Sequence, residues 1–174
     1  MYRMSAKPMI TAQQIQARVN ELAAEIEKDF VFDIILSALT GAFMFTTDLC
    51  RAMANPKHHI AFFKASSYGS GTESSGELKV SDIEHVDLHG KRVLLVDDIL
   101  DTGRTLGTLV PMLHDAGATE IRTCVLMNKE ERRTVDYHAD YVGFEIANEF
   151  VVGYGLDFDQ NYRTLPEVWT LEEA

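Results

Sequence analysis

Residues 93–105, VLLVDDILDTGRT, decide the fold of this chain. The apolar run 93–96 is typical of a strand that is buried on both faces of a parallel sheet. Asp97 and Asp98 follow at once, and residues 105–116 have the spacing of a helix that Gly117 ends. A strand, an acidic turn and a helix in this order place polar side chains at the carboxyl end of a strand, where open α/β sheets bind ligands.

The acidic turn indicates a cation and an anion bound side by side. Asp97 and Asp98 repel each other, so they need a cation or strong hydrogen bonds to remain ionised together. Mg²⁺ suits such hard oxygen ligands and often takes one or two carboxylates plus substrate oxygens. The small residues of 101–105 expose backbone N–H groups at a helix N-terminus and form an anion cradle. An acidic turn that only caps a helix would explain one of these acids, but not the whole string.

Strand and helix signals alternate along the rest of the chain. Thr11 and Gln14 form a capping box that opens the first helix. The other expected helices are 41–54 and 105–116, and the expected strands are 30–39, 59–65, 77–81, 93–96, 121–127 and 141–144. This alternation predicts an α/β fold of the Rossmann-like kind, with a mainly parallel twisted sheet flanked by helices. The Ser- and Gly-rich residues 66–76, SSYGSGTESSG, are expected to form a mobile lid loop.

Composition narrows the class of protein. The 174 residues suit a single domain over 1–174, and 46% of them are hydrophobic, which is enough for a buried core. The net charge of −11 opposes a nucleic-acid-binding face but not a local phosphate site. No apolar run reaches the ~18 residues of a membrane span, and the N-terminus lacks the apolar stretch of a signal peptide. We therefore expect a cytoplasmic protein without nucleic-acid or membrane partners.

Residues 93–105 also resemble a known motif. Their order of apolar strand, two acids, two spacer residues, Asp, Thr, Gly, any residue and Thr is that of the 5-phosphoribosyl-1-pyrophosphate (PRPP) motif of the phosphoribosyltransferases. The resemblance extends over roughly residues 12–165 and is to the hypoxanthine-guanine branch. It implies the type I phosphoribosyltransferase fold, with a core over about 30–145 and a small hood made from the N-terminal helix and about 146–174. It also implies Mg²⁺ as cofactor and a homo-oligomer, either a dimer or a tetramer.

The resemblance assigns the PRPP site residue by residue. Asp97 and Asp98 would face the ribose hydroxyls and the metal, and Asp101 would be the catalytic base near the purine N7. A non-proline cis peptide would join Leu39 to Thr40, which stands where the branch often has Lys. The implied PRPP-binding set is Leu39, Thr40, Gly41, Asp97, Asp98, Asp101, Thr102, Gly103, Arg104, Thr105 and Arg163.

The same resemblance assigns the purine pocket and the lid. Lys129 would donate to the 6-oxo group and Phe150 would stack on the ring. Val151 and Asp157 would read the ring edge, and Asp157 would join Asp97 and Asp98 as a metal residue. Ser67 and Tyr68 would form the tip of the lid, which would shield an oxocarbenium-like sugar from water.

These residues predict a purine salvage enzyme. It would transfer the 5-phosphoribosyl group from PRPP to hypoxanthine or guanine and release IMP or GMP and pyrophosphate. A cationic donor at Lys129 favours 6-oxo over 6-amino purines, but a xanthine-preferring enzyme remains an alternative because the 2-position would be read mostly by backbone groups. The other alternative is a PRPP-binding regulator of the RNA-attenuation type, which would need a basic RNA-binding face that the charge of −11 opposes.

Overall fold

A computed structural model of the chain describes residues 2–67 and 78–173. Within them a six-stranded sheet has the order β4-β3-β2-β5-β6-β7, and a small three-stranded sheet has the order β1-β9-β8. The strands of the large sheet are β2 (Ile34–Leu39), β3 (His59–Ser67), β4 (Leu78–Ser81), β5 (Arg92–Leu100), β6 (Glu120–Asn128) and β7 (Tyr141–Glu145). Those of the small sheet are β1 (Tyr2–Met4), β8 (Val151–Val152) and β9 (Trp169–Glu173). The helices are α1 (Ala12–Asp29), α2 (Phe43–Ala52) and α3 (Arg104–Asp115), with a 3₁₀ turn η1 (Glu130–Arg132).

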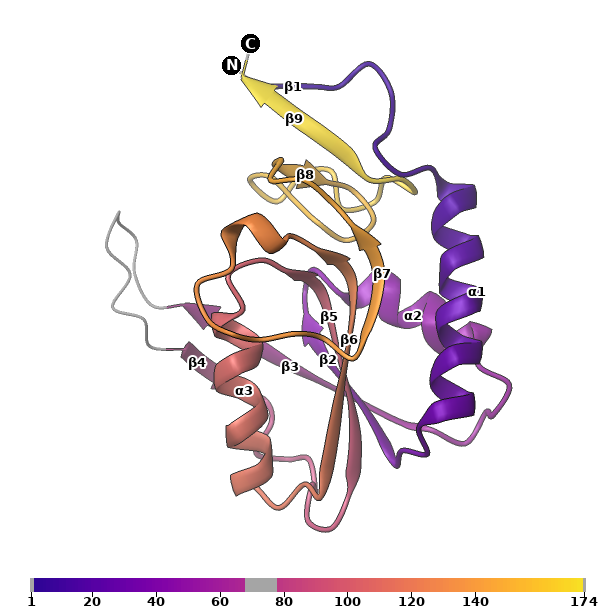
Figure 1. Cartoon of the computed structure of the whole chain (residues 1–174), viewed down its shortest axis with the longest axis vertical. Helices are drawn as coiled ribbons and strands as arrows, with labels where there is room; N and C mark the ends of the chain where they lie inside the picture. The colour runs from indigo at the N-terminus through magenta and orange to yellow at the C-terminus, as the bar shows by residue number, and fades with distance from the viewer. Residues whose placement is uncertain (1, 68–77, 174) are drawn as a thin grey trace.

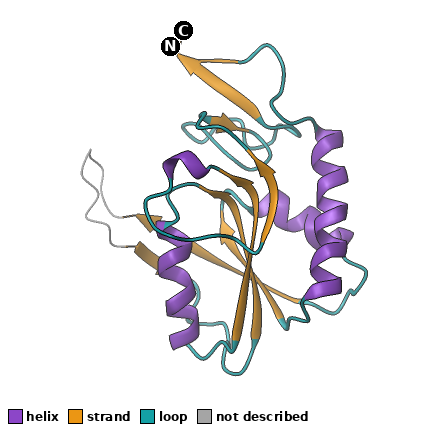
Figure 2. Ribbon diagram, viewed as in Figure 1, coloured by secondary structure: helices purple, strands orange, loops and turns teal. Residues whose placement is uncertain are grey.

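The large sheet is parallel except for the antiparallel pair β3–β4. Helices α1 and α2 lie on one side of it and α3 lies on the other (Figures 1 and 2). The small sheet is antiparallel and lies above the carboxyl ends of the large sheet's central strands as a hood, where both ends of the chain meet (Figure 1). This architecture confirms the predicted α/β fold, with its mainly parallel sheet, flanking helices and small hood.

The central strand β5 packs on both of its faces. Leu94 and Val96 point into the cluster that contains the buried sides of α1 and α2. Val93 and Leu95 point into the cluster beneath α3. All four side chains are fully buried, so two hydrophobic cores fix the position of this strand and of the acidic residues that it carries.

Helix α1 begins as the sequence predicts. Thr11 caps it, and the reciprocal bonds of the capping box are present: the Gln14 N–H donates to the Thr11 hydroxyl and the Thr11 N–H donates to the Gln14 amide oxygen. The buried stripe of α1 comprises Ile15, Val19, Leu22, Ala23 and Ile26. This stripe packs against α2 and β7, and it shares its hydrophobic core with Val151, Tyr154 and Val168 of the hood.

Two predicted boundaries were wrong. The expected strand 30–39 begins only at Ile34, because Phe30 is the C-cap of α1. Phe30 and Phe32 are apolar because their rings fill the core from a connecting segment. The strand expected at 93–96 continues to Leu100, so Asp97 and Asp98 lie within β5 instead of after it.

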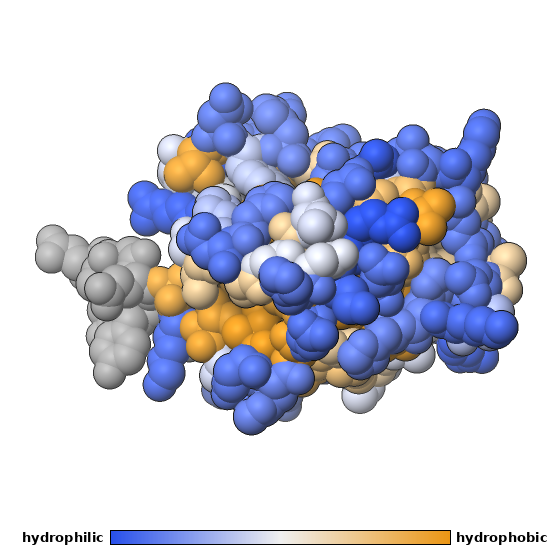
Figure 3. Space-filling view, turned by 90° about the horizontal axis from the view of Figure 1, so that it is seen from below, coloured by the Kyte–Doolittle hydropathy of each residue, from blue (hydrophilic) through white to orange (hydrophobic). Residues whose placement is uncertain are grey.

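No sequence pattern indicates the hood strands individually. They are short, and β9 pairs with β1 from the other end of the chain and with the two-residue strand β8, so no local period marks them. The hood is joined to the large sheet's helix layer by Tyr154, whose hydroxyl donates to an Asp48 carboxylate oxygen of α2 at 2.7 Å. The lower face of the molecule is mostly hydrophilic, with an apolar area beside the residues drawn in grey (Figure 3). No helix of the described chain has the length and apolar character to cross a membrane.

A buried hydroxyl pair joins β2 to α2. Ser37 Oγ and Thr46 Oγ1 lie 2.6 Å apart, and both residues are buried. Because water cannot reach either hydroxyl, each depends on the other for a hydrogen bond.

We predict that Ser37→Ala lowers the free energy of unfolding by about 1–3 kcal/mol, because it leaves the Thr46 hydroxyl buried without this partner. The double variant Ser37→Ala/Thr46→Val removes both hydroxyls, so its loss should be smaller than the sum of the single losses. Urea unfolding of the four proteins measures the coupling. Additive losses would show that the two hydroxyls do not stabilise each other.

Candidate functional site

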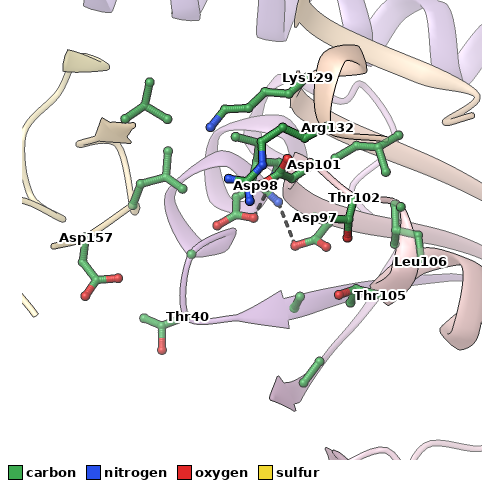
Figure 4. Close-up of a pocket in the computed structure, with 18 of the residues that line it drawn as sticks. Thr40, Asp97, Asp98, Asp101, Thr102, Thr105, Leu106, Lys129, Arg132 and Asp157 are labelled. Atoms are coloured by element: carbon green, nitrogen blue, oxygen red, sulfur yellow. Dashed lines mark hydrogen bonds and ion pairs between the residues drawn. The ribbon is translucent and has the colours of Figure 1, made fainter. Parts of the chain in front are cut away.

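A cavity of about 530 Å³ opens where the carboxyl ends of β2, β5 and β6 face the hood. It brings together most of the residues that the sequence analysis singled out. Its lining includes Leu39, Thr40, Gly41, Asp97, Asp98, Asp101, Thr102, Gly103, Thr105, Lys129, Phe150, Val151, Asp157 and Arg163. Figure 4 shows the acidic side chains of β5 in this cavity, with Asp157 facing them from the hood side.

Asp97 and Asp98 occupy the centre of the cavity as a like-charged pair. The Asp98 N–H donates to Asp97 Oδ1 at 2.9 Å, and the Ile99 N–H donates to Asp98 Oδ1 at 2.7 Å. Burial, and then the neighbouring charge of Asp98, raise the pKa of Asp97 well above its ordinary value. Burial also raises the pKa of Asp98, although the positive charge of Arg163 acts against the increase. The pair is therefore an incomplete electrostatic arrangement that a bound cation would complete.

The turn after β2 approaches this pair closely. A Cβ atom at Gly41 would lie 1.7 Å from Asp98 Oδ2, so only glycine leaves room for the carboxylate. The peptide bond between Leu39 and Thr40 is cis, as the resemblance implied. The backbone of this turn thus lines the cavity directly beside the acidic pair.

The phosphate cradle predicted at 101–105 forms a tight loop at the N-terminus of α3. Gly103 has φ 81° and is the N-cap of α3, whose first backbone N–H groups open toward the loop. Thr102 and Thr105 line the cavity with this loop. Arg104 does not: its Nε donates to Thr134 Oγ1 at 3.2 Å, and its side chain lines a second hollow on the other side of the loop.

Asp101 has two differently placed carboxylate oxygens. Oδ1 is buried and has no hydrogen-bond partner in the described part of the chain. Oδ2 lies 3.4 Å from an amino group of Arg132. Nothing in the sequence marks Arg132, because it lies in the charged run 129–133, KEERR, whose composition is that of a solvated face. Glu130 and Glu131 are exposed, whereas Lys129, directly before η1, and Arg132, its last residue, line the cavity.

The hood side of the cavity combines a cation, an aromatic ring and an ion pair. Lys129 is only 6% exposed, and burial lowers the pKa of its ammonium group. Phe150 is 51% exposed, lines the cavity and makes a T-shaped ring contact with Phe158. Asp157 Oδ1 lies 2.9 Å from Arg163 Nη2, so this ion pair stands opposite the β5 carboxylates.

The lid prediction falls mostly outside the described residues. Ser67 is the last residue of β3, where its backbone pairs with Leu78 of β4. Tyr68 lies outside the described residues.

The donor set fits Mg²⁺ only if a substrate supplies further oxygens. No group of three or more His, Cys, Asp or Glu side chains in the described chain is close enough to hold a metal ion by itself. The Asp97–Asp98 pair nevertheless offers carboxylate oxygens whose raised pKa values a cation would lower. One or two carboxylates plus substrate phosphate oxygens are the ligands that Mg²⁺ commonly takes.

A parallel sheet with an acidic pair and an anion-binding loop at its carboxyl edge defines an α/β protein that binds a phosphorylated small molecule. The family of the phosphoribosyl transferase domain matches residues 9–159. The chain is 43% identical over 170 residues to the hypoxanthine-guanine phosphoribosyltransferase of Aquifex aeolicus, covering 96% of this chain and 95% of that protein. It is 42% identical to the hypoxanthine phosphoribosyltransferase of Salmonella typhimurium, covering 92% of each.

A solved structure agrees with these sequences. The crystal structure of a hypoxanthine-guanine phosphoribosyltransferase from Bacillus anthracis, with a HEPES molecule in its active site, superimposes with a TM-score of 0.89 at 39% identity. The match covers 97% of this chain and 99% of that one. The chain therefore belongs to the hypoxanthine(-guanine) phosphoribosyltransferases, a branch of the type I phosphoribosyltransferase family.

The raised pKa of Asp97 predicts a gain in stability when its charge is removed. Because the folded-state pKa exceeds the unfolded-state pKa, ionised Asp97 destabilises the fold at alkaline pH. This penalty vanishes below about pH 4, where the carboxyl group is protonated in both states. Asp97→Asn retains the oxygen that accepts from the Asp98 N–H, so it should raise the melting temperature at pH 8 in metal-free buffer, by about 2–4 °C.

The gain in melting temperature of Asp97→Asn over the wild type should shrink as the pH is lowered from 8 toward 5. Thermal melts of both proteins with EDTA across this pH range measure the difference. A lower melting temperature for Asp97→Asn at pH 8 would contradict the interpretation of Asp97 as an electrostatically strained residue.

Proposed function

We propose that this protein transfers the 5-phosphoribosyl group of PRPP to hypoxanthine or guanine, giving IMP or GMP and pyrophosphate. The observation that carries the proposal is the shared cavity, in which the PRPP motif of β5 and α3 faces Lys129 and Phe150. A phosphosugar bound along the motif has its reacting carbon turned toward a purine held under the hood. This proximity favours transfer over a reaction between free solutes.

PRPP binding uses three parts of the chain. The loop from Asp101 to Thr105 and the first N–H groups of α3 hold the 5′-phosphate. Asp97 and Asp98 accept hydrogen bonds from the ribose hydroxyls. The turn at Gly41 exposes backbone to the pyrophosphate, and Arg163 adds positive charge at the same end of the cavity.

The purine is recognised by one cation and one ring. The Lys129 ammonium donates to the 6-oxo group, and the exposed ring of Phe150 stacks on the base. Val151 and Asp157 read the ring edge through their backbone groups. In adenine an amino group replaces the 6-oxo group. The Lys129 ammonium and this amino group are both donors, so neither would find an acceptor in the other, which disfavours adenine.

Asp101 removes the proton from the purine nitrogen as the glycosidic bond forms. Its oxygen Oδ1, which has no hydrogen-bond partner among the described residues, accepts the proton, while Arg132 holds the other oxygen. Mg²⁺, bound by Asp97, Asp98 and Asp157 together with substrate oxygens, would supply charge stabilisation for the departing pyrophosphate. The chain's own contribution is to hold donor and acceptor in line and to keep the proton acceptor beside the purine.

A turnover assay tests the proposal directly. Purified protein with Mg²⁺ and PRPP should form IMP from hypoxanthine and GMP from guanine, and steady-state kcat/KM for these bases and for xanthine measures the preference. Absence of both products would refute the proposed function.

We predict that Asp101→Asn lowers kcat by about 10²- to 10⁴-fold, because the amide cannot accept the purine proton. PRPP binding, measured by calorimetry without purine, should weaken far less, since Asn retains a similar shape beside the phosphate loop. An equal loss in kcat and in PRPP affinity would show that Asp101 only positions the phosphate.

We also propose that the enzyme is a cytoplasmic homo-oligomer. The free thiols of Cys50 and Cys124 suit a reducing compartment. On β3, Ile60 and Phe62 are 41% and 39% exposed. Ile60 pairs in register with Ile35 of β2, and Phe62 pairs with Ser37. Ile35 and Ser37 lie on the face of the sheet that α1 and α2 cover. Ile60 and Phe62 therefore lie on the same face of the sheet, beyond the area that these helices cover.

A second subunit seated on this face would bury both side chains. We predict that Phe62→Lys shifts the protein to a smaller species in sedimentation equilibrium, because a charge would then be buried in the contact. Met112→Lys is the matched control, because Met112 of α3 is 41% exposed and lies on the other side of the large sheet. A wild-type protein that sediments as a monomer would contradict the proposal.

A further inference from the structure

Arg133 joins three separate segments beside the active site. Its Nε donates to the backbone oxygen of Asp101 at 3.1 Å. One amino group of its guanidinium donates to the backbone oxygen of Tyr137, and the other donates to the side-chain oxygen of Asn128. The guanidinium therefore connects the end of β5, the end of β6 and the loop that follows η1.

Asn128 is a rigid partner for this guanidinium. Its side chain is 5% exposed, and its amide nitrogen donates to Glu145 Oε2 of β7 at 2.9 Å. Because the amide nitrogen is held by Glu145, the amide oxygen is turned toward Arg133. Asn128 immediately precedes Lys129, so the same strand end anchors the guanidinium and carries the proposed 6-oxo donor.

The Arg133 stem also fits the shape of the phosphate loop. A Cβ atom at Gly103 would lie 2.8 Å from Arg133 Cδ, so the loop and the arginine are in direct contact. Next to it, the Thr134 N–H donates to the Thr102 oxygen at 3.0 Å, and the Lys129 N–H donates to the Leu100 oxygen at 2.9 Å. The segment after β6 is thus hydrogen-bonded along the loop after β5. Between these two backbone bonds, the Arg133 side chain holds the backbone oxygen of Asp101.

We propose that Arg133 is a positioning residue, which holds the backbone of Asp101 at a set place relative to Lys129 and so aims the Asp101 carboxylate at the purine. The inference rests on the proposed function, in which Asp101 accepts the purine proton. The backbone bonds of Thr134 and Lys129 remain when Arg133 is changed, so the phosphate loop keeps its support while the Asp101 backbone oxygen loses the bond from Arg133. Lysine cannot replace the arginine, since one ammonium group does not reach three oxygens in a plane.

The first test compares Arg133→Lys and Arg133→Met with the wild type. Both variants should lower kcat by about 10- to 100-fold, because a displacement of the order of 1 Å at the reacting groups has an effect of this size. The KM for PRPP should change by less than about three-fold, since the loop keeps its backbone bonds. If the lysine variant retained the wild-type kcat, the positive charge alone would explain Arg133 and the positioning role would be refuted.

Arg18→Met is the matched control for simple loss of an anchoring arginine. Arg18 donates to the backbone oxygens of Val142 and Gly143 at 2.8 and 3.0 Å, at a place away from the cavity. Its loss should lower the melting temperature without changing kcat at a temperature where the protein is folded. Circular dichroism melts identify that temperature for every variant. An Arg133 variant with the Arg18 pattern, destabilised but with unchanged kcat, would refute the inference.

A double-mutant cycle with Asp101→Asn gives the decisive readout. If Arg133 acts through Asp101, then Arg133→Lys should lower kcat by less than about three-fold in the Asp101→Asn background. The same factor in both backgrounds would show that Arg133 acts independently of Asp101. If the wild type formed neither IMP nor GMP, the proposed function would be refuted. If the wild type turned over and Arg133→Lys kept full activity, only this inference would be refuted.

Discussion

The constraint on which the rest of this structure depends is the burial of two adjacent carboxylates, Asp97 and Asp98, in one cavity. Two hydrophobic cores fix the strand that carries them, so the carboxylates cannot move apart by shifting the backbone. Burial and their mutual repulsion raise the pKa of Asp97, and the cavity around the pair accommodates that strain. Gly41 makes room for one carboxylate, and Arg163 places positive charge opposite it. A cationic or hydroxyl-rich ligand would compensate the two carboxylates of such a site.

The cavity is assembled from chain segments that are far apart in sequence and meet at one edge of the sheet. The strands β2, β5 and β6 end beside one another, which follows from a parallel sheet with short connections. The hood then faces that edge and brings Phe150 and Asp157 opposite the acidic pair. Because the donor and acceptor subsites belong to different segments, their relative position depends on contacts between the segments. Arg133 is one such contact, and it lies between the phosphate loop and the strand that carries Lys129.

The motif residues could be predicted because they are local. The strand, acidic turn and helix N-terminus of 93–105 follow one another directly, and thirteen residues specify their order. The side-chain direction of a residue in or beside a turn was harder to predict. Arg132 lies in a charged run that has the composition of a solvated face, yet its side chain pairs with Asp101. Arg104 stands inside the motif, yet it points to Thr134 and away from the cavity, because successive residues at a helix start face different directions.

The sequence by itself determined the class of fold, the acidic pair, the phosphate loop and the capped first helix, since each depends on neighbouring residues and on a short period of apolar positions. It also placed Lys129, Phe150 and Asp157 in order along the chain. Only the tertiary structure decided which of these share a cavity, that a side chain at position 41 would displace the Asp98 carboxylate, and that Arg133 spans three segments. Contacts of this kind join residues that are distant in sequence, and their geometry comes from the packing of both cores and the hood, which no local pattern contains.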